Sequence, residues 1–102
     1  LLLAACSQSP QARQIDEIRD TADRQADQIE KQADERAEPL DTQAKQLREQ
    51  ARQAGGYDGK RLEVQAESLE KQAELIRDQA EEQAEAVKAA ANARVQAIEA
   101  SN

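Results

Sequence analysis

Few side chains in this sequence could take part in covalent chemistry. Cys6 is the single cysteine, there is no histidine, and none of the serines Ser7, Ser9, Ser68 and Ser101 has a plausible base beside it. A serine or cysteine nucleophile is weak unless an adjacent base activates it, and a single cysteine cannot form a disulfide within the chain. We therefore expect no enzymatic activity from these side chains.

The residues before Cys6 resemble the end of a secretory signal sequence. Three leucines are followed by Ala4 and Ala5, and an apolar segment that ends in small residues is the pattern at which such a signal is cleaved. The stretch Leu3-Ala4-Ala5-Cys6 resembles the lipobox of bacterial lipoproteins. Without that resemblance, Cys6 reads as an incidental thiol at the start of a helix.

The lipobox resemblance implies a site of modification and a cellular location. Cys6 is expected to carry a covalent diacylglycerol, with cleavage between Ala5 and Cys6, so that residues 1–5 are a signal remnant and residues 6–9 form the lipidated cysteine and a short tether. Two or more acyl chains hold a protein firmly at a membrane. Ser7 is similar to the residue found at this place in lipoproteins of the outer membrane, which favours its periplasmic face over the inner membrane. No other cofactor is expected.

The composition excludes several classes of partner. The chain has a net charge of −7, 34% charged residues and one aromatic residue, Tyr57. Binding to nucleic acid depends on neutralising phosphates with basic side chains, so we expect no nucleic-acid partner. The absence of His and Met argues against a site for soft metals, and no metal or small-molecule substrate is expected. Because low hydrophobicity with high charge also suits a disordered chain, order has to be argued from the residue pattern.

Apolar and alanine positions recur every three or four residues in two long runs, which indicates two amphipathic helices. We predict helices over residues 10–54 and 60–101, with a turn at residues 55–59 that contains all three glycines. Ser9 followed by Pro10 is typical of a helix N-cap and first helical position. Asp58 suits the N-cap of the second helix.

The two runs have complementary spacing, which predicts that the helices pack antiparallel. The first run repeats every 11 residues and then every 7, and the second does the reverse. Bulky residues pair with bulky ones or Ala54 where residue numbers add to 116, and alanines pair with alanines where they add to 117. The pairs that add to 116 are Ala54/Leu62, Leu47/Leu69, Leu40/Ile76, Ile29/Val87 and Ile18/Ile98; those that add to 117 are Ala51/Ala66, Ala44/Ala73, Ala37/Ala80, Ala33/Ala84 and Ala26/Ala91. The predicted fold is therefore an all-α, antiparallel two-helix coiled-coil hairpin.

Local features add two expectations. Pro39 lies inside the first run, where a proline removes an amide donor and clashes with the carbonyl four residues earlier, so we predict a kink there, or a break with Glu38 near a new cap. Acidic and basic residues four apart, such as Asp41/Lys45 and Glu67/Lys71, predict ion pairs within each helix.

Two surface features are candidates for contacts with a partner. Val64, Leu75, Ala86 and Ala97 repeat every 11 residues outside the main seam, as they would if another helix, from a second copy or a different protein, packed against them. The alternative is that alanine is simply a good helix former. Tyr57 at the turn either contacts a partner or packs over its own turn.

These features favour a structural protein. The chain is similar to the small alanine-zipper lipoproteins of the outer membrane in its acylated cysteine and alanine-rich seam. It departs from them in being a hairpin and in ending Ala100-Ser101-Asn102, without the terminal Lys used for attachment to peptidoglycan, so covalent wall linkage is not expected. The expected function is a membrane-anchored spacer, scaffold or oligomeric coiled coil of the envelope. The alternative is a periplasmic adaptor or inhibitor that binds a helical partner through the Val64/Leu75/Ala86 stripe.

Overall fold

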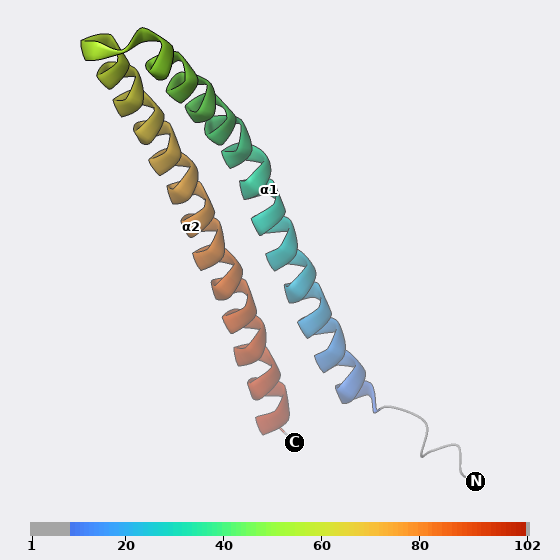
Figure 1. Cartoon of the computed structure of the whole chain (residues 1–102). Coiled ribbons are helices and arrows are strands. Elements are labelled where there is room, and N and C mark those ends of the chain that lie inside the picture. Colours follow the sequence, from blue (N-terminus) through green and yellow to red (C-terminus); the bar gives the residue numbers. More distant parts are fainter. Residues whose placement is uncertain (1–8, 102) are drawn as a thin grey trace.

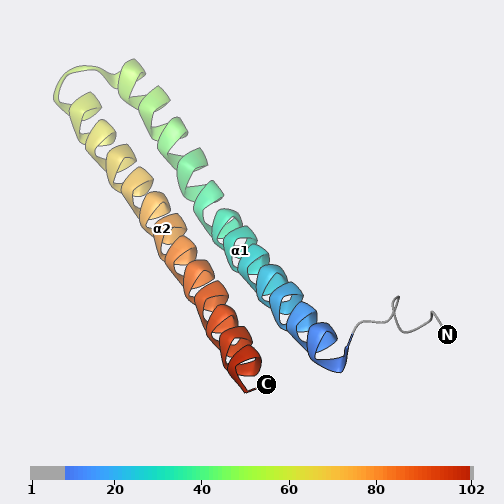
Figure 2. The same cartoon turned by 90° about the horizontal axis from the view of Figure 1, so that it is seen from below.

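The protein is a hairpin of two long antiparallel helices (Figure 1). The computed structural model describes residues 9–101, in which α1 spans Pro10–Ala54 and α2 spans Gly56–Ala100. The helices lie side by side along their whole length in both views (Figures 1 and 2). The first residues of α1 and the last residues of α2 lie at the same end of the hairpin, which we call the open end. The chain reverses direction at the opposite end, which we call the tip. This confirms the predicted all-α two-helix hairpin.

The open end is held by local caps and by one contact between the helices. The Ser9 hydroxyl accepts a hydrogen bond from the Ala12 amide at 3.0 Å, and Pro10 is the first helical residue, as the sequence predicts. The Gln11 side-chain amide donates to the Ile98 carbonyl at 2.9 Å, and the Ser101 hydroxyl donates to the same carbonyl at 2.8 Å. These bonds satisfy backbone groups that helix ends leave without partners.

The reversal is tighter than predicted, because a single residue, Gly55, separates the helices. α2 begins at Gly56 rather than at residue 60, and Asp58 lies in its first turn instead of capping it. Gly55 has φ 64° and ψ 177°, a region that only glycine occupies readily, and Gly56 has φ 57°. The Gly59 amide donates to the Gly55 carbonyl at 2.9 Å, which closes the first turn of α2 directly after the reversal.

Gly59 belongs to the helix packing and not to the turn. It is a buried helical residue, and a Cβ placed on it would lie 2.7 Å from the backbone oxygen of Ala51 on the opposite helix. The absence of a side chain at Gly59 therefore lets the two backbones meet at the tip.

Small residues fill the centre of the seam between the helices. The buried residues are Ile18, Ala22, Ala26, Ala33, Ala37, Ala44 and Ala51 on α1 and Gly59, Ala66, Ala73, Ala80, Ala84, Ala91 and Val95 on α2. They follow the predicted mixture of 7- and 11-residue repeats. Alanine side chains allow the helices to approach closely, and the largest apolar residues of the core gather at the open end, around Ile18 and Val95.

The bulky residues of the seam are only partly buried. We call them the bulky row: Ile29, Leu40 and Leu47 on α1 and Leu62, Leu69, Ile76 and Val87 on α2. A hairpin of two helices has no third layer that could cover them.

α1 continues through Pro39 as one helix of 45 residues, so the predicted break with a new cap near Glu38 is wrong. Pro39 and Glu35 are both exposed. The Glu35 carbonyl receives no hydrogen bond from residue 39, because proline has no backbone N–H. Both arms curve gently in the same direction (Figure 1).

Candidate interaction surfaces

The predicted lipidation site lies outside the described residues. Ala5 and Cys6 precede Ser9, where the described part of the chain begins. Within residues 9–101, neither helix contains an apolar segment of the length that a membrane span requires.

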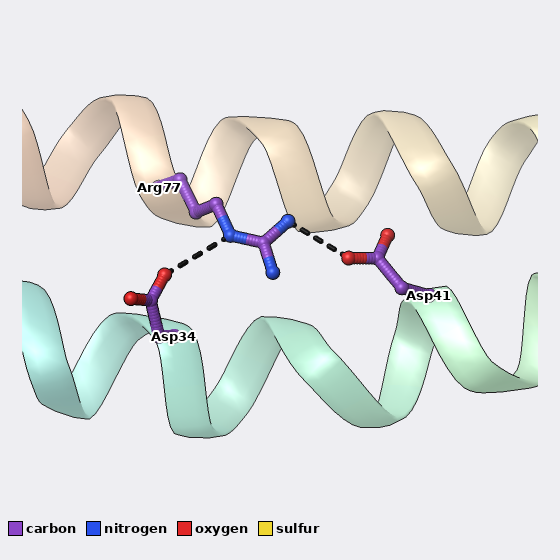
Figure 3. A network of polar contacts seen from close by, with 3 residues as sticks. All are labelled: Asp34, Asp41 and Arg77. Carbon is purple, nitrogen blue, oxygen red and sulfur yellow. Dashed lines mark hydrogen bonds and ion pairs between the residues drawn. The ribbon is translucent and has the colours of Figure 1, made fainter.

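Ion pairs between the helices line one edge of the seam (Figure 3). Arg77 on α2 lies between two carboxylates of α1: its Nε is 3.1 Å from Asp34 Oδ1 and its Nη1 is 2.8 Å from Asp41 Oδ2. The hydrogen bond to Asp41, followed by that to Asp34, raises the pKa of Arg77. Arg48 and Glu70 form a second pair between the helices at 2.5 Å. These pairs tie the arms together on one edge.

These ion pairs were not predicted from the sequence, because the spacing of four residues indicates only partners within one helix. Glu67 and Lys71 do lie within 3.8 Å, but Asp41, which was expected to pair with Lys45, contacts Arg77 across the seam. The predicted pairing of the helices could have located these ion pairs. The residue numbers of both Asp41/Arg77 and Arg48/Glu70 add to 118, one more than those of the alanine pairs.

The predicted stripe on α2 is on the surface. Val64 and Leu75 are 65% and 57% exposed, and together they line a shallow groove with Ser68 and Gln72. Ala86 and Ala97 are exposed farther along the helix and do not line that groove. The structure thus brings together the two large members of the stripe and leaves the alanines outside the groove.

Tyr57 lies in the first turn of α2, at the tip, and is 76% exposed. The alternative in which it packs over its own turn is therefore wrong, and its ring is accessible to a partner. Among the residues that the structure describes, no three acidic or cysteine side chains gather where they could hold a metal ion.

The edge of the seam opposite the ion pairs is poor in charge. One groove on it is lined by Leu47 and Leu69 of the bulky row together with Gln43, Gln46 and Gln50. Toward the open end, the next groove contains Ile29, Gln32 and Gln83, together with Ala80, Glu35 and Arg36. Near the tip this side of the hairpin offers apolar side chains and amides, and Glu35 and Arg36 join them toward the open end, whereas the other side offers ion pairs.

Comparison with known proteins gives no relative: no protein-family model matches the chain, and no curated protein or solved structure is significantly similar to it.

Proposed function

We propose that the protein is a membrane-anchored spacer or scaffold of the bacterial envelope. Acyl chains on Cys6 hold it at the periplasmic face of the outer membrane, and the hairpin carries the tip away from that surface. The chain has no catalytic role.

The observation that carries this proposal is the placement of the chain ends. α1 begins and α2 ends at the open end, and the tip is at the far end of both arms (Figure 2). A lipid on Cys6, three residues before Ser9, would therefore hold the open end at the membrane. Each arm has 45 residues, which corresponds to about 67 Å at 1.5 Å per residue. The continuous helices and the ion pairs across the seam suit a stiff rod of fixed length.

The second candidate is an adaptor or inhibitor that binds a helical envelope protein through the groove at Val64 and Leu75. The observation in its favour is the exposure of these two side chains, which with Tyr57 are the exposed large apolar residues of the described chain. In the spacer the length of the arms determines function, and in the adaptor the groove does.

A matched pair of variants separates the two candidates. Deletion of residues 19–29 together with residues 87–97 removes one 11-residue repeat from each arm, keeps the register, and retains Val64 and Leu75. Each arm becomes about 16 Å shorter. The matched variant keeps the full length and carries Val64→Gln with Leu75→Gln.

Each variant replaces the native protein in bacteria that otherwise lack it, and resistance of the cells to detergent is measured. The spacer predicts that the shortened hairpin fails to restore resistance and that the Gln variant restores it. The opposite result, with full restoration by the shortened hairpin and none by the Gln variant, would establish the adaptor and refute the spacer.

A further inference from the structure

The two edges of the seam differ because of helix geometry. Successive residues of an α-helix are about 100° apart. Leu40 therefore lies about 60° to one side of the buried Ala37, and Asp41 about 40° to the other side. Ile76 and Arg77 flank the alanines of α2 in the same way. Since Asp41 and Arg77 contact each other on one edge, Leu40 and Ile76 meet on the opposite edge.

Glutamines flank the bulky row on both arms at matching levels. Residue numbers that add to 115 identify the pairs Gln50/Gln65, Gln43/Gln72 and Gln32/Gln83, and all six side chains are exposed. We call the bulky row and these glutamines the uncharged face. From Leu40 to the tip its members are only Leu, Ile and Gln.

We propose that a second copy of this chain packs on the uncharged face, with both hairpins pointing in the same direction, to form a four-helix bundle. This pairing goes beyond the spacer function and requires no lipid. It shares only Gln72 with the groove at Val64 and Leu75, and it covers the bulky row that a single hairpin leaves partly exposed.

Charge favours a second copy as the occupant. Each chain has a net charge of −7, so two copies repel unless they meet where charge is absent. The uncharged face is self-complementary, because amides hydrogen-bond to amides and apolar side chains pack on each other. In a bundle with its twofold axis along the rods, α1 of one copy lies on α2 of the other. Arg36 then faces Gln79 of the other copy and meets no like charge.

The spacing of the bulky layers favours a dimer in which both hairpins point in the same direction. From the open end to the tip, the layers 18/98, 29/87, 40/76, 47/69 and 54/62 are separated by 11, 11, 7 and 7 residues. Two hairpins that point the same way place every layer on its own equivalent. Two hairpins that point in opposite directions place 11-residue spacings against 7-residue spacings, and bulky layers then fall on glutamines.

The available area matches that of a typical dimer. The uncharged face runs from Ile29 to the tip, about 39 Å along the arms, and at two helix widths it covers about 780 Å². A typical specific interface needs about 800 Å² from each partner.

The first test measures the oligomeric state of the full chain by light scattering after size exclusion. Every variant carries Cys6→Ser, so that no disulfide forms through Cys6. The parent is expected at about twice its monomer mass of 11.3 kDa. Gln43→Glu with Gln50→Glu places four carboxylates in the interface of the dimer and should weaken dimerisation about a hundredfold or more. Gln28→Glu with Gln53→Glu adds the same charge on exposed positions away from this face and should leave the dimer intact.

The second test determines whether the two hairpins of the dimer point in the same direction. Two chains are mixed, one with Gln43→Cys and one with Gln72→Cys, and oxidised. A disulfide between the two different chains is expected, because these positions lie at the same level only in the parallel bundle. A parent that is monomeric at high micromolar concentration overturns the proposal, as does a dimer that survives Gln43→Glu with Gln50→Glu or the absence of the mixed disulfide. None of these results affects the lipid anchor, which is tested separately.

Discussion

Replacing Gly59 with alanine is expected to destabilise the hairpin, by about 1–3 kcal/mol of unfolding free energy. The new methyl group would lie 2.7 Å from the backbone oxygen of Ala51. No side chain can turn away to relieve this contact, so the arms must separate at the tip. Helix propensity predicts the opposite sign, because alanine stabilises a helix by about 0.5–1 kcal/mol relative to glycine.

Thermal unfolding followed by circular dichroism shows directly whether Gly59→Ala lowers or raises the stability of the hairpin. Lys60→Ala is the matched control, because Lys60 is the exposed neighbour of Gly59 in the same helix and is expected to leave the melting temperature nearly unchanged. A Gly59→Ala variant that melts at a higher temperature than the parent would show that the backbones do not meet at the tip.

The second large effect is expected at the centre of the seam. Ala73 has no exposed surface and packs where the two helices approach closely. Ala73→Leu adds three carbon atoms to that contact, and overpacking of this kind costs about 1–3 kcal/mol. The hairpin is especially sensitive because its core is a single narrow seam, with no second layer that could move to accommodate the larger side chain.

Ala89→Leu is the control for this change. Ala89 is exposed on the same helix, and leucine is nearly as good a helix former as alanine, so the stability should change by less than about 0.5 kcal/mol. Urea unfolding of both variants gives the comparison. Equal midpoints for the two variants would mean that the seam has room for leucine and that close approach of the helices is not required.

The fold could be predicted in detail because two sets of residues, the bulky ones and the alanines, indicate the same pairing of the two helices. Bulky and alanine positions keep a constant pairing for about 40 residues, so the partner of Leu40 or Ala44 followed from arithmetic alone. The boundary of α1 was also predictable, since Ser9 and Pro10 have side-chain and backbone preferences that act within one helical turn.

The tip could not be predicted in the same way. A cluster of three glycines indicates a turn, but it does not show which glycine reverses the chain and which one permits close packing. Gly55 does the first and Gly59 the second, because the backbone of Ala51 passes directly over Gly59. That distance depends on how the two arms meet in space, which no local pattern encodes.

The candidate surfaces were predictable to different degrees. The exposure of Val64 and Leu75 followed from their position off the seam. The ion pairs of Arg77 were missed because partners were expected within each helix, and a cross-seam pair competes successfully when two carboxylates lie on the facing arm. The uncharged face was missed because glutamines carry no periodic apolar signal, and their grouping appears only when both arms are placed together.

The intact mass of the native protein extracted from bacterial membranes shows whether Cys6 carries the proposed lipid anchor. We expect a chain that begins at Cys6 and is heavier than residues 6–102 by a diacylglycerol, with a further acyl group where the new amino group is also modified. A chain that retains residues 1–5 and carries an unmodified thiol on Cys6 would contradict the anchor and the envelope location that depends on it.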